Sequence, residues 1–308
     1  MLMIPTVFGI LFAGFLVIYL TPGDPALMMA GQDAPPEVVE NIRQQWGLNE
    51  PFTVQFGKYM GNLMRGNLGR SMTSGWEVAE ELRRTLPRTL ELVLVATLWS
   101  VLIGVPLGTI SAVKRGTIVD RVSTIIAVIG VSLPVFFIGL MLMWLFAFEL
   151  KVFPMGSYGG PLWTLKGWRH IALPSLTLGM FSTASLARVT RSTMLDVLGQ
   201  DYIRTARAKG LAKNKVVYRH ALKNALIPVV TLIGINMARL IGGSVVTETI
   251  FSWPGVGRMM IMGLTSQDIP VIQGCLLAKG LMVAVLNLVV DVTYTFVDPR
   301  IKLSQGGI

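Results

Sequence analysis

Residues 90–113 read LELVLVATLWSVLIGVPLGTISAV, an apolar run whose one charged side chain is Glu91. A helix needs about 20 apolar residues to cross the hydrocarbon core of a bilayer. This run is long enough, so it predicts a transmembrane helix and makes the bilayer the natural solvent for the chain.

Five further apolar stretches have similar lengths. The weakest is rich in Ser and Thr and contains Pro174. We therefore expect an all-α membrane protein with about six transmembrane helices, while five or seven stay open. The further stretches lie at 2–20, 122–150, 171–188, 225–246 and 271–297.

Composition supports the membrane assignment. The chain is 52% hydrophobic and 14% charged, whereas soluble domains carry roughly 25% charged residues. A net charge of +10 would point to nucleic acid in a soluble protein. In a membrane protein it indicates basic cytoplasmic loops instead, and we expect lipid rather than nucleic acid as the surroundings.

The basic residues gather on one side of the membrane if the N-terminus lies inside. Segments 114–121, 188–224 and 298–308 then hold 14 Lys and Arg, while the short opposite segments 151–170 and 248–270 hold 4. Cytoplasmic loops carry such an excess, so both termini are predicted to be cytoplasmic.

One extramembrane segment, 21–89, is large enough to form a small helical cap on the outer face. Pro35 and Pro36 open a predicted helix that Gly47 ends.

The first apolar stretch, 2–20, is too long and too poor in basic residues for a typical signal peptide. We expect four parts, namely a first transmembrane helix, this cap, a core of helices 2–6 and a tail, at 1–20, 21–89, 90–297 and 298–308.

The polar segment 195–224 interrupts the core. Asp201 is a good N-cap for a helix at 202–209, and Gly210 falls where a left-handed C′ residue belongs. A second helix is expected from Asn214. The pair could be a rigid lever toward a partner or a solvated basic loop, and the pattern alone leaves both open.

Five motifs that resemble those of a known family favour the rigid lever over the solvated loop. The run DYIRTARAKGL at 201–211 resembles the cytoplasmic signature loop of ABC importers in its peptide-permease form, with Arg204-Thr205-Ala206 in place of the general Glu-Ala-Ala. Four more motifs agree in order with the B-type subunit of the dipeptide, oligopeptide and nickel permeases. They are LTPGDP, GNLGRS, the turn after the fifth stretch and DPRI, at 20–25, 66–71, 242–257 and 298–301.

This resemblance implies a type I ABC importer permease in a prokaryotic plasma or inner membrane. This chain and a related second permease subunit would form the pathway. Two cytoplasmic ATPases would use ATP and Mg, and an extracytoplasmic solute-binding protein would deliver the substrate. The chain itself would be non-catalytic and bind no cofactor; it has no Gly-x-x-x-x-Gly-Lys-Ser/Thr loop.

On the same resemblance, one helix docks on an ATPase. Ala206 and Ala208 are small enough for close packing in a groove, while Arg204, Arg207 and Lys209 can pair with acidic groups on its rim. The predicted coupling residues are Asp201, Tyr202, Arg204, Thr205, Ala206, Arg207, Ala208, Lys209, Gly210 and Leu211.

Small and charged residues within the predicted spans suggest roles in helix packing and in the transport pathway. Gly234, Ala238 and Gly242 recur every four residues and predict a helix-packing stripe. Arg239 and Lys279 are costly inside a membrane. Either could attract a peptide carboxylate in the pathway, pair internally or reach toward an interface.

A structural latch is expected where two spans reach the cytoplasmic side. Asp291 lies near the end of the sixth stretch, and Arg188 and Arg191 end the fourth. All three lie at the same predicted membrane level, so Asp291 is expected to pair with one of the arginines.

Other classes of function are less well supported. An ion-gradient-driven secondary transporter would be expected to show repeats, and an intramembrane zinc enzyme would need a His-Glu-x-x-His pattern. With only Cys275, His170 and His220, a Cys- or His-based metal site is not expected. The sequence leaves open whether a dipeptide, a longer peptide, glutathione or a nickel chelate is carried, and whether the permease pair is homo- or heteromeric.

Overall fold

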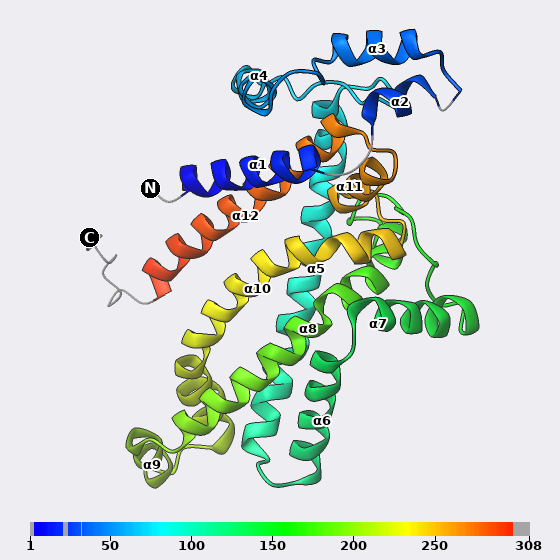
Figure 1. Cartoon of the computed structure of the whole chain (residues 1–308). Coiled ribbons are helices and arrows are strands. Elements are labelled where there is room, and N and C mark those ends of the chain that lie inside the picture. The colour runs from blue at the N-terminus through cyan, green and yellow to red at the C-terminus, as the bar shows by residue number, and fades with distance from the viewer. Residues whose placement is uncertain (1–2, 21–23, 32, 298–308) are drawn as a thin grey trace. The chain divides into compact units, whose positions relative to one another are not determined.

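The computed structural model describes residues 3–20, 24–31 and 33–297, and its regular structure there is helical (Figure 1). This agrees with the predicted all-α class. The chain divides into two compact units, Met1–Thr89 with Pro254–Ala284 and Leu90–Trp253 with Val285–Ile308. The predicted tail at 298–308 lies outside the described residues.

The long helices α5 (Val78–Val113) and α12 (Ile269–Val297) contribute to both units. The remaining helices of the first unit are α1 (Met3–Leu20), α2 (Pro25–Ala30), α3 (Pro36–Gln45), α4 (Phe52–Met64) and α11 (Val256–Thr265). Those of the second unit are α6 (Ile118–Ser132), α7 (Val135–Leu142), η1 (Met143–Glu149), α8 (Leu165–Leu198), α9 (Asp201–Ala208), η2 (Lys215–Leu222) and α10 (Lys223–Ile250), with η1 and η2 wound as π-helix.

The described residues between α1 and α5 form three helices. The helix predicted after Pro35 is α3, and Gly47 follows it with φ +64° as expected of a helix-ending glycine. Aromatic rings join α4 to α1, since the Phe15 ring centroid lies 5.4 Å from that of Phe52 and 5.3 Å from that of Phe56. The aromatic side chains of α4 therefore pack against the first apolar helix.

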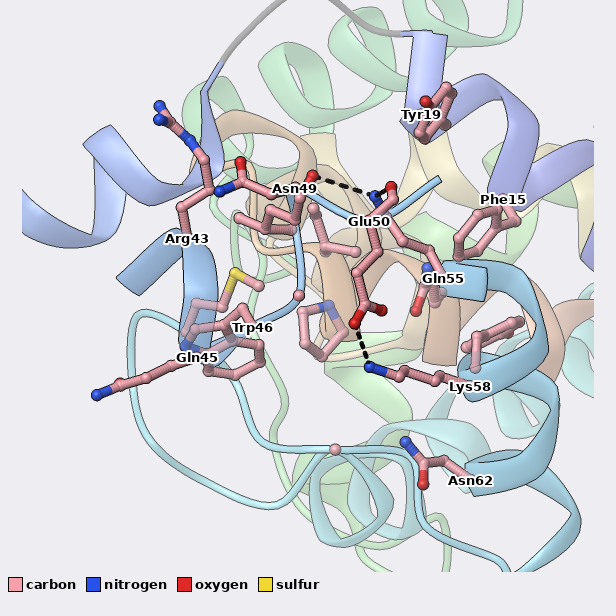
Figure 2. A pocket seen from close by; sticks show the side chains of 18 of the residues that line it. Phe15, Tyr19, Arg43, Gln45, Trp46, Asn49, Glu50, Gln55, Lys58 and Asn62 are labelled. Carbon is pink, nitrogen blue, oxygen red and sulfur yellow. Dashed lines mark hydrogen bonds and ion pairs between the residues drawn. The ribbon is translucent and has the colours of Figure 1, made fainter. Parts of the chain in front are cut away.

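Asp268 fastens a loop of the first unit to the beginning of α12. Its carboxylate accepts hydrogen bonds from the Ser71 hydroxyl at 2.6 Å and the Thr73 backbone N–H at 3.1 Å. Val78 and Cys275 are completely buried in the adjoining core. A hollow of about 650 Å³ opens in this unit between the end of α1, α3, α4 and the start of α12 (Figure 2).

Three helices in the described part of the chain are long and apolar enough to cross a membrane: Val78–Val113, Lys215–Ile250 and Ile269–Val290. The pair Ile118–Ser132 and Val135–Glu149 would make a fourth if counted as one span, although it bends by 110°. Pro134 lies at this bend, where a proline cannot continue the helix ladder. The six-span count stays a prediction.

Close backbone contact joins α5 to α8 in the second unit. A Cβ at Gly104 would lie 2.7 Å from the Thr183 carbonyl oxygen, and one at Gly179 would lie 2.6 Å from that of Ala96. The Ser100 hydroxyl also donates to the Gly179 carbonyl at 2.9 Å. Ala96 of α5 meets Gly179 of α8 and the later Gly104 meets the later Thr183, so the two helices run parallel. The helix α10 packs along α8 (Figure 1).

Substituting Gly108 with alanine tests this contact. The new Cβ would lie 2.4 Å from the Ala187 carbonyl oxygen and 2.7 Å from the Thr190 Cβ, so the helices must separate at a cost of about 1–3 kcal/mol. We expect a lower melting temperature in detergent. Gly61→Ala, on α4 with no atom within 4 Å of its Cβ position, should melt as the wild type; equal melting of both variants would contradict the contact.

Candidate functional site

The predicted lever forms a short helix followed by a sharp turn. The helix α9 begins one residue earlier than expected: Gln200 is its N-cap, and Asp201 is the first helical residue rather than the cap. Asp201 still suits this end of the helix, since its negative charge faces the positive end of the helix dipole. Its carboxylate also lies 3.4 Å from the Arg204 guanidinium.

Gly210 ends α9 in the predicted left-handed conformation, with φ +75°. The Leu211 N–H donates to the Ala206 carbonyl at 3.3 Å and the Gly210 N–H to the Arg207 carbonyl at 2.9 Å. These two bonds form a Schellman motif, which satisfies carbonyls that the helix end would otherwise leave unpaired. A residue with a Cβ is disfavoured here, so the glycine is needed for the turn.

The inner face of α9 is occupied by the chain itself. Ile203 is completely buried and Ala206 is 9% exposed. They pack with Met194 of α8 and with apolar residues on and around η2, namely Val216, Val217, Ala221 and Ala225. Ala112 at the end of α5 joins the same cluster. The small size of Ala206, expected to serve a partner's groove, is thus used within this chain.

The outer face of α9 is polar and basic. Tyr202, Arg204, Thr205, Arg207, Ala208, Lys209 and Gly210 are all exposed. The Tyr202 hydroxyl accepts a hydrogen bond from the Asn224 side chain at 2.8 Å, which ties the helix to the base of α10. The surface therefore offers three cations around the small side chain of Ala208.

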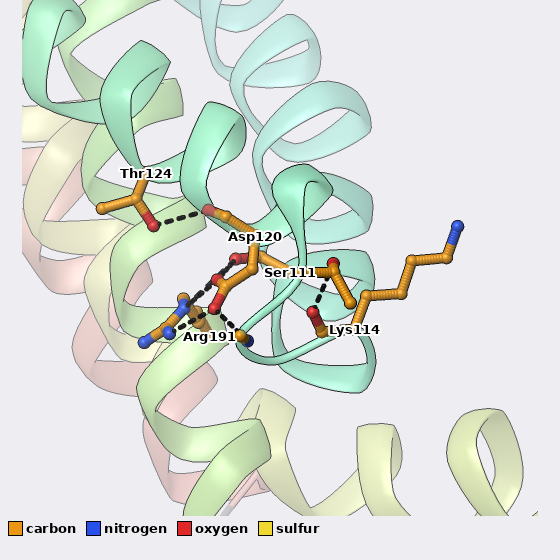
Figure 3. A network of polar contacts seen from close by, with 7 residues as sticks. Ser111, Lys114, Asp120, Thr124 and Arg191 are labelled. Carbon is orange, nitrogen blue, oxygen red and sulfur yellow. Dashed lines mark hydrogen bonds and ion pairs between the residues drawn. The ribbon is translucent and has the colours of Figure 1, made fainter.

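A buried polar network lies at the neighbouring ends of α5, α6 and α8 (Figure 3). The Arg191 guanidinium donates from Nε to Asp120 Oδ1 at 2.7 Å and from Nη2 to Asp120 Oδ2 at 2.9 Å. The Ser111 hydroxyl donates to Asp120 Oδ1 at 2.5 Å, and the Gly116 N–H donates to Oδ2 at 3.0 Å. Bidentate pairing of this kind adds geometric specificity as well as energy.

Asp120 is the partner that sequence reasoning missed. The predicted latch paired Asp291 with Arg188 or Arg191; the structure gives Arg191 to Asp120, and Arg188 is exposed. The Asp291 side chain lies outside the described residues. The sequence did contain one signal for this pairing, because Asp120 is the single acid in the basic segment 114–121.

The predicted packing stripe on α10 is occupied only in part. A Cβ at Gly234 would lie 2.4 Å from Val290 of α12, whereas Gly242 has no atom within 4 Å of its Cβ position and is exposed. Arg239 is also exposed, and its guanidinium lies 5.4 Å from the centre of the Phe181 ring. Lys279, on α12 in the first unit, is half-buried.

Comparison with known proteins identifies the family to which this chain belongs. Residues 104–303 match the binding-protein-dependent transport system inner membrane component, and residues 2–93 match the N-terminal component of such membrane proteins. The dipeptide transport system permease protein DppB of Alkalihalophilus pseudofirmus is 41% identical, over 98% of this chain and 97% of its own. The glutathione transport system permease protein GsiC of Escherichia coli K12 is 43% identical, over 97% and 96%.

The fold agrees with a solved transporter as well. A chain of the MetNI methionine ABC transporter in an inward-facing conformation superposes with a TM-score of 0.57 over 70% of this chain and 96% of its own, at 19% identity. This chain therefore belongs to the family of inner membrane components of binding-protein-dependent transport systems. It is a multi-pass permease subunit of an ABC importer, a system that also contains ATPase and substrate-binding components.

Replacing Asp120 with asparagine tests the network. The change leaves the Arg191 guanidinium without its carboxylate, at an expected cost of about 1–3 kcal/mol. We expect a clear loss of melting temperature for the purified chain. Asp196 is an exposed acid on α8, the helix that carries Arg191, so Asp196→Asn should change the melting temperature little. If both variants lose the same stability, the loss does not come from the network around Asp120.

Proposed function

We propose that this chain forms half of the membrane pathway of an ATP-driven importer of small peptides. The main support is its identity of 41–43% over nearly the whole chain with permeases named for dipeptide and glutathione transport. Its partners would be a second permease subunit, two ATPases and an extracytoplasmic binding protein. Both termini, and the segment from Arg188 to Asn224, would lie in the cytoplasm.

In this proposal the outer face of α9 docks on an ATPase. Arg204, Arg207 and Lys209 would meet acidic groups at the edge of the ATPase surface, and Ala208 would allow close approach. Rim charges of this kind steer partners and set register more than they add affinity. Ile203 and Ala206 would pass the ATPase movement to η2, α8 and α10, because all of these pack in one cluster.

The Asp120–Arg191 pair would extend this rigid connection to α5 and α6. Ser111 belongs to the network, and the next residue, Ala112, belongs to the cluster beneath α9. A displacement of α9 would therefore move the ends of α5, α6 and α8 together. We also propose that Arg188 pairs with Asp291.

The open part of the α10 stripe would face the second permease subunit. Gly242 is exposed with space around it, which suits close approach of another helix in lipid. Arg239 lies on the same helix and would line the pathway, where its charge can attract the carboxylate of a peptide. Lys279 is a second candidate for this role.

Gly210→Pro tests whether α9 is the docking element. Proline fixes φ near −65° and cannot adopt the observed +75°, so the turn after α9 must change. We expect the ATPases to be lost when the variant is purified from membranes with its partner subunits, while the permease still inserts.

The control is Gly66→Pro, because Gly66 ends α4 with the same pair of bonds: its N–H donates to Leu63 and that of Asn67 to Asn62. This variant should keep its ATPases. Retention of the ATPases by Gly210→Pro at wild-type level would exclude α9 as the docking element. Absence of any ATPase from the wild-type preparation would oppose the importer proposal itself.

A further inference from the structure

The hollow in the first unit has features of a ligand site that its structural role does not explain. Its volume of about 650 Å³ lies within the range of small-molecule sites, roughly 300–1,000 Å³. Its lining is rich in carboxamides, and those of Gln45, Asn62 and Gln273 make no hydrogen bond within the described part of the chain. A carboxamide donates and accepts at once, which matches the N–H and C=O of a peptide group.

Glu50 lines this hollow with a partly exposed carboxylate side chain. Its Oε1 accepts a hydrogen bond from Lys58 at 2.7 Å, whereas its Oε2 is buried and has no hydrogen-bond partner (Figure 2). The side chain as a whole is 35% exposed, and a carboxylate oxygen can accept more than one hydrogen bond, so Oε1 has capacity for a donor from a ligand beside Lys58. An ammonium group supplies a charged donor of the right sign.

The rest of the lining suits the other parts of a short peptide. Trp46 is 41% exposed at the hollow and offers an aromatic surface to an apolar side chain. Lys58 is 61% exposed, so its ammonium can also approach a carboxylate. Acid, cation, carboxamides and an aromatic ring thus lie around one cavity.

We propose that this hollow binds short peptides by their free α-ammonium group, with Glu50 as the acceptor and the carboxamides facing the peptide bonds. This inference rests on the proposed function and adds to it a substrate-binding site on the permease itself. In the proposed orientation the site opens on the extracytoplasmic side, where the binding protein delivers its peptide.

Equilibrium dialysis tests the site on the permease assembled with its partner permease and ATPases in lipid nanodiscs, without nucleotide or binding protein. The probes are radiolabelled alanyl-alanine and its N-acetylated form. We expect saturable binding of the free dipeptide and at least about tenfold weaker binding of the acetylated one, because acetylation removes a charged hydrogen bond. Glu50→Gln should bind both forms weakly and equally.

Two variants complete the design. Glu77→Gln removes another carboxylate of the same unit, paired with Arg70 at 3.3 Å and absent from the hollow's lining, and should behave as wild type. Asn62→Leu should weaken both probes to the same degree and leave the preference for a free ammonium intact. It tests the hollow even if Glu50→Gln fails to fold.

The outcomes separate this site from the proposed function when uptake into proteoliposomes with the binding protein is measured in parallel. ATP-driven uptake without saturable binding to the wild type overturns the site and leaves the function standing. Discrimination that persists in Glu50→Gln, or binding unchanged in Asn62→Leu, also overturns the site. Binding with the expected discrimination but no ATP-driven uptake supports the site and opposes the function.

Discussion

Close packing of α5 against α8 is the interaction on which the second unit depends. Lipid gives two apolar helices little reason to associate, so contact in a membrane relies on small residues and complementary surfaces. Gly104, Gly108 and Gly179 provide them by allowing each helix to touch the backbone of the other. Side chains at these positions would keep the helices apart and separate the groups at their ends.

That contact places the polar network and the α9 cluster side by side. Ser111 and Ala112 end α5, while Arg191 and Met194 lie one turn apart near the end of α8. Ser111 and Arg191 hold Asp120, whereas Ala112 and Met194 pack against the inner face of α9. The helix that we propose as the docking element therefore packs on α5 and α8, the two helices that are in close contact with each other.

Much of this was accessible from the sequence because the signals were local. The apolar runs 90–113 and 271–297 predicted helices that the structure shows as the candidate spans 78–113 and 269–290, and the glycine pattern predicted the turn at Gly210. The first helical residue of α9 was missed by one position, since both Gln200 and Asp201 can begin a helix and tertiary packing decides between them.

Non-local features could not be read in this way. Nothing near Arg191 in the sequence indicates that its partner is 71 residues away on α6. The inward direction of Ala206 depends on Val216 and Val217 covering it, so a motif alone did not distinguish the face used inside from the face offered to a partner. The hollow with Glu50 joins helices from both ends of the chain and has no sequence signature.

The claim most open to direct test is that α9 presents its outer face to an ATPase. A photo-crosslinking residue at Arg207, exposed on α9, can be compared with one at Arg115, an exposed cation between α5 and α6. In membranes containing all partner subunits, we predict a crosslink to an ATPase from position 207 and little from position 115. A crosslink from position 115 alone, or from neither position, would contradict the account.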